Sequence, residues 1–336
     1  MLTLGAGAVL RNGSCETRSA GVSLDGTGAK LVMEDASLIT GCTLTGGASY
    51  GAAVLIGNGS SGPQFEMKGG AISGCAALTT SAATSGYGGT VYVYGGDFVM
   101  SGGAITDNAC EKSVGGVLYY SGTMSLSGAA TVFGNSGLYP DLYVHDGDKK
   151  RTNVHASGAL SGRIGVSVAN LAEGNLLPIT ADGDLGGIWN IVPSAQDGVV
   201  SGLAAALDLQ NPGDVKWQAS AGSIDDVQFA SVADAQAACP RELSVDPADL
   251  SGLPHVFSGC ACEIEAQIVL GFDVAAMETY LEDHPEGITL LQAETGSAFA
   301  GGITFVLPAD ADNLTVTRGR TRCRLTRKRG LAIILR

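Results

Sequence analysis

The sequence predicts an all-β fold in which the chain is wound as a coil of stacked strands, and three observations lead to this prediction. First, one short apolar phrase recurs after 34, 33 and 26 residues, with copies that begin at Leu31, Phe65, Phe98 and Met124. Second, the copies alternate apolar and mixed residues, the period of a strand that buries one face. Third, the chain holds 50 glycines among 336 residues and only 6% aromatic residues, which favours turns over a packed α/β core.

A single repeat of this size is not stable by itself. Ordering about 26 residues costs on the order of 25–50 kcal/mol of backbone entropy, whereas each buried Leu, Phe or Met returns about 1.5–3 kcal/mol. Stacked repeats share backbone hydrogen bonds at about 4.8 Å spacing and bury both sides of every inward side chain. We therefore expect the repeats to form one array.

Equivalent positions of stacked strands lie above one another, so each repeat position forms a column of side chains. Two columns are wholly apolar and are expected to face inward: Leu31, Phe65, Phe98 and Met124, and two residues further on Met33, Met67, Met100 and Leu126. The column between them is mixed, as expected of a face that touches water: Val32, Glu66, Val99 and Ser125. The backbones of Phe65 and Phe98 should therefore pair.

A second strand in each repeat carries the main candidate binding residues. Its aliphatic column is expected to face inward: Val54, Val91, Leu118 and Leu142. The neighbouring column would then face outward: Leu55, Tyr92, Tyr119 and Tyr143. Three stacked tyrosines would present flat apolar rings with hydroxyl groups, which suit sugar rings or a partner protein. Alternatively, another part of the chain covers these rings, or they serve only cross-strand packing.

A third strand follows each Gly-Gly pair and ends in a column of small residues, Cys42, Cys75, Asn108 and Asn135. Stacked asparagines can bond the backbones of their neighbours. Cys42 and Cys75 fall on successive repeats, within the Cα separation that a disulfide needs, although a stack of small buried free thiols is the favoured interpretation. Cys260 and Cys262 are too closely spaced for the usual zinc pairing, and no second Cys/His cluster accompanies them, so we predict no metal and no cofactor.

Charge is unevenly distributed along the chain. The net charge is −14, but residues 318–336 contain eight of the 19 Lys and Arg residues and no acid, so residues 1–317 carry −22. An acidic body repels phosphates and anionic membranes, which argues against nucleic acid as a partner. Four arginines alternate at the basic end and would share one face of a strand: Arg318, Arg320, Arg322 and Arg324. They either dock an acidic partner or glycan, or pair with the chain's own acids such as Asp310 and Asp312.

Three regions are expected: repeats over 1–147, degenerate rungs or a transition layer over 148–201, and a C-terminal β-rich capping module over 202–336. In the last region we predict one helix from Ser231 to Cys239, ended by Pro240, and one from Asp273 to His284, ended by Pro285. Predicted strands of this module are 264–272, 288–292, 303–307, 314–317 and 331–335. The module is expected to cover the open end of the coil, whose strand edges would otherwise invite aggregation.

The beginning of the chain resembles neither a membrane segment nor a leader peptide. No apolar run reaches about 18 residues, so no transmembrane helix is expected. Met1–Leu10 lacks a basic start and a long apolar core, and it has instead the pattern of a β rung. We expect that the sequence begins inside a longer protein.

The sequence predicts no catalytic residues. Polysaccharide-active enzymes need carboxylates or basic residues gathered on adjacent repeats, but Glu66, Asp97 and Asp107 each align with uncharged residues. The four histidines neither cluster nor accompany a Ser or Cys motif: His145, His155, His255 and His284. A lyase or glycoside hydrolase, with acids brought together in another way, is the alternative.

Several repeated phrases carry a family resemblance. They are Gly-Gly-Ala-Ile at 69–72 and 102–105, Gly-Gly-x-Val/Leu-Tyr at 88–92 and 115–119, and Phe133-Gly134-Asn135. Over residues 1–147 the chain resembles bacterial adhesin-like surface proteins, in the style of polymorphic outer-membrane protein and autotransporter passenger repeats. The resemblance implies a right-handed parallel β-helix, secreted or at the cell surface, that binds a glycan or surface protein without catalysis. It also implies a monomer or a fragment of a larger surface protein.

Overall fold

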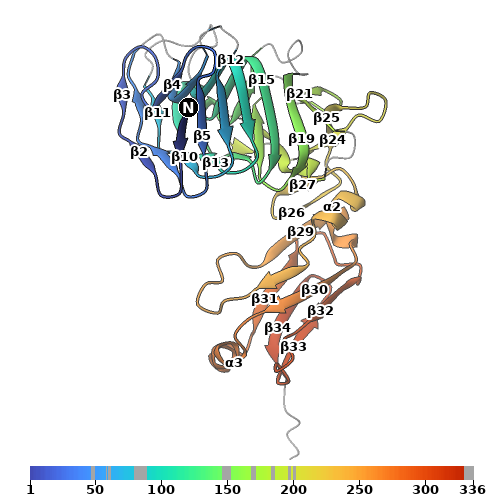
Figure 1. Cartoon of the computed structure of the whole chain (residues 1–336). Helices are drawn as coiled ribbons and strands as arrows, with labels where there is room; N and C mark the ends of the chain where they lie inside the picture. Colours follow the sequence, from blue (N-terminus) through green and yellow to red (C-terminus); the bar gives the residue numbers. More distant parts are fainter. Residues whose placement is uncertain are drawn as a thin grey trace, which may run out of the picture. The chain divides into compact units, whose positions relative to one another are not determined.

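The computed structural model divides the chain into two compact units, Met1–Ala219 and Ser220–Arg336, which are described separately (Figure 1). The residues that the structure describes are 1–46, 50–57, 59, 62–78, 89–145, 153–167, 172–182, 186–195, 198–199 and 202–328.

The first unit is a solenoid-like array of parallel strands arranged in four ladders. The first ladder contains β1 (Leu2–Leu4), β5 (Lys30–Met33), β9 (Gln64–Met67), the second half of β12 (Gly89–Met100), the second half of β15 (Val117–Gly128), β19 (Val154–Leu160) and β21 (Leu176–Ala181). The second contains β2 (Val9–Arg11), β6 (Leu38–Thr40), β10 (Ala71–Ser73), β13 (Ala104–Thr106), β16 (Thr131–Val132), β20 (Ile164–Ser167) and β22 (Ile191–Ala195).

Two further ladders complete the array. The third contains β3 (Ser14–Cys15), β7 (Thr43–Leu44), β11 (Ala76–Ala77), β14 (Ala109–Val114) and β17 (Ser136–Tyr139). The fourth contains β4 (Val22–Leu24), β8 (Gly51–Ile56), the first halves of β12 and β15, β18 (Leu142–Val144) and β20. The third ladder was not predicted, because strands as short as β7 and β11 show no alternation that a sequence pattern could reveal.

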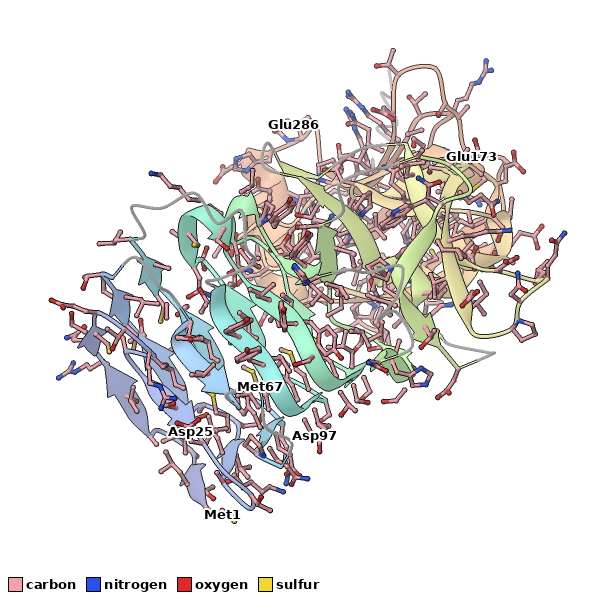
Figure 2. All side chains as sticks on the ribbon, turned by 90° about the horizontal axis from the view of Figure 1, so that it is seen from above. Met1, Asp25, Met67, Asp97, Glu173 and Glu286 are labelled. Carbon is pink, nitrogen blue, oxygen red and sulfur yellow. The ribbon has the colours of Figure 1, made fainter. Side chains whose placement is uncertain are left out.

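The predicted inward columns are confirmed. Leu31 pairs with Phe65, Phe65 with Phe98, and Phe98 with Met124. The rings of Phe65 and Phe98 stack with their centroids 4.9 Å apart, and neither ring is exposed. Met1 lies at one end of the array, and Asp25, Met67 and Asp97 follow along it (Figure 2). The side chains of the two columns fill the core of this unit.

The predicted phase of the second strand is wrong by one residue in β15. Val91 pairs with Val117, so Leu118 lies opposite Tyr92 rather than in the inward column. The predicted alignment matched the Gly-Gly phrases at 88–89 and 115–116, which places Tyr119 beside Tyr92. The observed register is shifted by one residue in the first half of β15. Such a shift turns each side chain of that segment to the opposite face of the strand. A register irregularity after Val93 restores the predicted pairing in the second half of β12.

Parallel stacking continues beyond residue 147 and then changes character. Strands β19 to β22 still pair in parallel with earlier strands, as the degenerate rungs of the prediction. Three antiparallel strands follow: β23 (Gly198–Val199), β24 (Leu203–Leu207) and β25 (Asp214–Ala219). Strand β25 covers the edge of β21 and buries Trp217, so residues 203–219 belong to the first unit and not to a module that begins at 202. The capping role of the second unit stays a prediction.

The second unit contains two sheets. The larger has the order β27 (Val227–Phe229), β26 (Gly222–Ile224), β29 (His255–Gly259), β31 (Ile288–Ala293), β34 (Arg322–Arg327) and β33 (Leu314–Arg318). The smaller contains β28 (Glu242–Ser244), β30 (Ala266–Gly271) and β32 (Ile303–Val306). The 3₁₀ helix η3 (Cys260–Glu263) belongs to this unit, and η2 (Ile188–Asn190) to the first. The predicted strand over 331–335 lies outside the described residues.

Both predicted helices are confirmed, as α2 (Val232–Ala238) and α3 (Val274–Asp283). The Ser231 hydroxyl caps α2 by accepting a hydrogen bond from the amide of Asp234 at 3.2 Å. Asp273 caps α3 in the same way, through the amide of Ala276 at 2.8 Å. Among the described residues, no helix has the length and apolar character needed to cross a membrane.

Candidate functional site

A cluster of tyrosines lies on the outer face of the fourth ladder and is the strongest candidate for a binding site. It rests on Leu55, Leu118 and Val114, which are buried and form a cluster separate from the core of the array. Its members, here called the tyrosine cluster, are Tyr50, Tyr92, Tyr94, Tyr120, Tyr139 and Tyr143.

Tyr92 is the centre of this cluster. Its ring is fully buried and lies 5.4 Å from Tyr94 in a nearly parallel stack and 6.0 Å from Tyr50. The ring of Tyr120 contacts two of these rings edge-on, that of Tyr92 at 6.4 Å and that of Tyr94 at 5.2 Å. Aromatic rings prefer offset-stacked and edge-to-face contacts at these distances. The surrounding tyrosines are half-buried, so their ring contacts fix their positions while part of each residue remains exposed to solvent.

The cluster extends along the ladder through two further ring pairs. Tyr139 stacks on Tyr143 at 3.9 Å with 12° between the ring planes, and Tyr120 lies 4.7 Å from the ring of His145. Segments from four different turns therefore contribute to one aromatic surface.

The structure separates the three predicted binding tyrosines. Tyr92 is present in the cluster but fully buried, and Tyr143 is half-buried on its edge. Tyr119 faces the core instead, where it pairs with Val93 and Val144 and its hydroxyl donates to the carbonyl of Gly122 at 2.5 Å. The predicted exposed column of three tyrosines is therefore wrong, because Leu118 stands between Tyr92 and Tyr143.

Four members of the cluster were missed by the sequence analysis: Tyr50, Tyr94, Tyr120 and Tyr139. The available signal was spacing, since residues two apart on a strand share a face: Tyr94 follows Tyr92 by two residues, and Tyr120 follows Leu118 by two residues. Tyr50 and Tyr139 come from outside the second strand of their repeats, and no column of that strand contains them.

A polar surface continues from the tyrosine cluster around a corner of the array. Strand β12 leaves the fourth ladder at Tyr94 and enters the first ladder at Asp97, across Gly95 and Gly96. A Cβ on Gly96 would lie 2.4 Å from the carbonyl oxygen of Pro63, so the corner requires glycine there. The Asp97 carboxylate accepts a hydrogen bond from the Thr123 hydroxyl at 2.7 Å.

The same outer face carries further hydrogen-bonded pairs. Lys30 bonds Glu66 at 2.5 Å, and the Ser125 hydroxyl donates to Ser157 at 2.7 Å. These contacts join residues of adjacent turns and fix the hydroxyl and carboxylate groups in rows.

His155 joins this face to β21, the last strand of the first ladder. Its Nδ1 lies 3.0 Å from the Thr180 hydroxyl, and its Nε2 lies 3.0 Å from Asp182 Oδ1. A hydroxyl, an imidazole and a carboxylate in this order are the parts of a nucleophilic relay. The Thr180 hydroxyl also lies 3.3 Å from the carbonyl oxygen of Val154, which competes for its proton. We therefore interpret the contacts of His155 with Thr180 and Asp182 as structural: they hold β19 and β21 in register.

A column of buried asparagine side chains, here called the asparagine column, lies beside the cluster, inside the array. The side-chain carbonyl of Asn108 accepts the amide proton of Cys75 at 3.0 Å, and that of Asn135 accepts the amide proton of Asn108 at 3.2 Å. The amide groups of both side chains donate to carbonyls of the preceding turn, Asn108 to Ile72 and Asn135 to Ile105. The predicted stacking of asparagines against neighbouring backbones is confirmed.

Asp141 lies at the end of the asparagine column and is almost fully buried. Asn135 donates to its Oδ1 from both the backbone and the side chain, at 3.1 and 3.0 Å, and Ser194 donates to its Oδ2 at 2.7 Å. A Cβ on Gly165 would lie 2.2 Å from Oδ2, so that position is restricted to glycine. Burial raises the pKa of the Asp141 carboxyl above its ordinary value of 3.8, although the hydrogen bonds and the charge of Arg163 oppose this rise.

We expect Asp141→Asn to flatten the pH dependence of stability. Because the pKa of Asp141 is raised in the folded state, the wild type is relatively most stable below the unfolded-state pKa and loses stability as pH rises through the folded-state pKa. Asparagine keeps an acceptor for Asn135 and can donate to Ser194, but it carries no charge. Urea unfolding across this pH range checks the prediction, and parallel curves for the two proteins would contradict it.

The four predicted docking arginines do not share one face. Arg318 ends β33 and Arg322 begins β34, with Arg320 in the turn between them. Arg318 lies opposite Cys323, whereas Thr317 lies opposite Arg324, so Arg318 and Arg324 point to opposite faces of the hairpin. A single alternating strand was predicted because the turn at 319–321 carries only one glycine.

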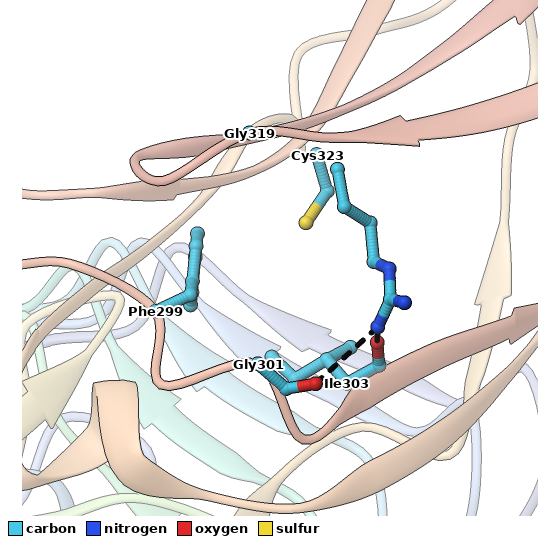
Figure 3. Close-up of a pocket in the computed structure, with 6 residues that line it drawn as sticks. Phe299, Gly301, Ile303, Gly319 and Cys323 are labelled. Atoms are coloured by element: carbon cyan, nitrogen blue, oxygen red, sulfur yellow. Dashed lines mark hydrogen bonds between the residues drawn. The ribbon is translucent and has the colours of Figure 1, made fainter.

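Arg318 instead lines a pocket of about 260 Å³ in the second unit (Figure 3). Its guanidinium donates to the carbonyls of Gly301 and Ile303, and the sulfur of Cys323 points into the pocket opposite Phe299. Burial raises the pKa of the Cys323 thiol, which Arg318 partly offsets. These bonds hold the end of β33 against β32.

Within the described part of the chain, no three or more His, Cys, Asp or Glu side chains gather as a metal site. Cys260 and Cys262 are buried as free thiols in η3. Comparison of the chain with protein-family models, curated proteins and solved structures finds no match.

Proposed function

We propose that this chain is a non-enzymatic β-helix protein, secreted or at the cell surface, that binds a glycan through the tyrosine cluster on its outer face. Four parallel ladders in register favour a β-helix, and the family resemblance of the repeats favours its right-handed form, a bacterial origin and an adhesin-like role. The single observation that carries the binding proposal is the set of half-buried rings over a closed apolar base.

The surroundings of the cluster favour sugar as the ligand. Aromatic faces bury the apolar C–H surface of a sugar ring, while fixed hydroxyl and carboxylate groups bond its hydroxyls. Tyr94 and Tyr120 supply the rings, and Asp97 with Thr123 supplies the polar groups one step further along the same strands. Packing against Tyr92 fixes the rings beforehand, so little side-chain entropy is lost on binding.

Tyr94→Ala is expected to weaken glycan binding about tenfold, the loss of roughly 1.4 kcal/mol of ring contact. A glycan array screened with the wild-type protein selects the oligosaccharide, and calorimetric titration then compares the Kd values. Tyr280→Ala is the matched control, because Tyr280 is also half-buried and stacked, on His284 in the second unit. A wild type that binds nothing on the array, or equal losses in both variants, would overturn the proposal.

A further inference from the structure

Cys42 and Cys75 occupy equivalent positions on two adjacent turns. The residues on either side pair in register, Thr40 with Ser73 and Thr43 with Ala76. The amide of Ala76 donates to the carbonyl of Cys42 at 2.9 Å, so the two backbones are hydrogen-bonded at this point. Paired strands bring such Cα atoms about 4.8 Å apart, which lies inside the range of disulfides.

The turn before each cysteine has the same conformation. Gly41 has a φ of 63° and Gly74 a φ of 64°, a left-handed geometry that glycine adopts without strain. Because the two turns match, the two Cα–Cβ bonds leave the backbone in matching directions. The column places one cysteine directly beside the other.

The thiol pair has no competing cysteine in its column. The neighbouring positions are Gly13 on one side of Cys42 and Asn108 on the other side of Cys75, where Asn108 fixes the Cys75 amide at 3.0 Å. Cys110 is buried in the next ladder and pairs with Gly137. A bridge that forms in this column therefore has a single possible pairing.

The two thiols also make equivalent hydrogen bonds, Cys42 to the carbonyl of Thr40 at 3.8 Å and Cys75 to the carbonyl of Ser73 at 3.7 Å. Interaction with the Cys75 thiol lowers the pKa of the Cys42 thiol to about 6, against the opposing effect of burial. The same contact and burial raise the pKa of Cys75. A thiolate is the attacking species in thiol–disulfide exchange, so during folding either cysteine can attack first and the other then completes the bridge.

We propose that Cys42 and Cys75 form a disulfide that joins two turns of the array when the protein folds in the presence of a small-molecule disulfide. In one of the two equivalent orders, the Cys42 thiolate attacks one sulfur of that disulfide and releases the first small thiolate. The Cys75 thiolate then attacks the Cys42 sulfur and releases the second. One S–S bond forms and one breaks, two protein thiols lose their protons, and the small disulfide is reduced to two thiols.

Because both sulfur atoms are buried in the folded protein, the exchange belongs to folding rather than to the finished structure. The test therefore refolds the full chain from urea with oxidised and reduced glutathione, and in parallel with reduced glutathione alone. Remaining thiols are alkylated, and peptide mass spectrometry locates the bridge. The expected result is a linked pair of peptides, containing Cys42 and Cys75, that is lighter by two hydrogen atoms and absent from the reduced sample.

Thermal unfolding supplies the second readout. The oxidised wild type should melt roughly 5–10 °C above the reduced protein, because the bridge restricts the unfolded chain across one full turn. Cys42→Ala should abolish this difference, whereas Cys110→Ala, which removes another buried thiol of the same unit, should retain it. Peptide mapping of the wild type decides the question even where a variant does not fold. Alkylation of both Cys42 and Cys75 after oxidative refolding would overturn the proposal.

Discussion

Phe98→Ala is expected to lower the free energy of unfolding of the first unit by about 3–5 kcal/mol, the cost typical of removing a buried phenylalanine ring. The Phe98 side chain is fully buried between Phe65 on one turn and Met124 on the next. Its removal leaves a cavity between these two side chains, each of which then packs against empty space on one side. Stacked turns cannot close such a gap without shortening the spacing of their backbone hydrogen bonds.

The chain is well suited to this measurement, because both of its tryptophans, Trp189 and Trp217, lie in the first unit. Urea unfolding followed by tryptophan fluorescence therefore reports that unit. Val99→Ala is the matched control: Val99 is the next residue along β12, faces outward and is 41% exposed. A cost below about 1 kcal/mol is expected there. Equal losses in the two variants would contradict the assigned faces of the strand.

The stack of apolar columns could be predicted from the sequence because each copy carries two apolar residues two positions apart. A register error of one residue would turn Phe65, Phe98 and their neighbours to the solvent, so the pattern admits one phase only. The helices were predictable for a similarly local reason, since Ser231 and Asp273 cap them through their own side chains.

The candidate site could not be predicted to the same degree. In the second strand both faces are apolar, with Val117, Leu118 and Tyr119 in succession, so burial does not select the phase. The phase follows instead from the register irregularity between β12 and β15, which depends on pairing across turns. Tyr50 and Tyr139 join the cluster from other segments, and only the folded chain brings them to it.

The arginines illustrate the same limit at a turn. Alternation of Arg318 to Arg324 has the period of a strand, but a hairpin interrupts it at Gly319, whose amide bonds the carbonyl of Arg322 at 2.7 Å. Pairing between β33 and β34 then decides which residues share a face. A periodic pattern alone does not distinguish one long strand from two short ones.

Asn135→Ala is expected to destabilise the first unit by about 3–5 kcal/mol, although it removes little apolar surface. The change deprives the Asn108 amide and the Ile105 carbonyl of their partners and takes one donor from Asp141. A buried polar group without a partner costs about 1–3 kcal/mol, and these groups are buried between turns where no side chain can replace the amide. Asn190→Ala is the control, since the half-buried Asn190 side chain donates to the carbonyl of Leu160 at 2.7 Å and bonds no buried carboxylate in the described structure.

The loss should also depend on pH, because Asn135 supplies two of the donors that favour the ionised form of Asp141. Removing the side-chain donor raises the pKa of Asp141 further, so the variant should lose additional stability relative to the wild type as pH rises. Asp141→Asn in the same background removes the charge and should remove this additional, pH-dependent loss while the loss at Asn108 and Ile105 remains. Urea unfolding of the two single variants and the double variant, across pH, measures this coupling. Strictly additive, pH-independent losses would mean that the asparagine column and the Asp141 carboxylate contribute independently to stability.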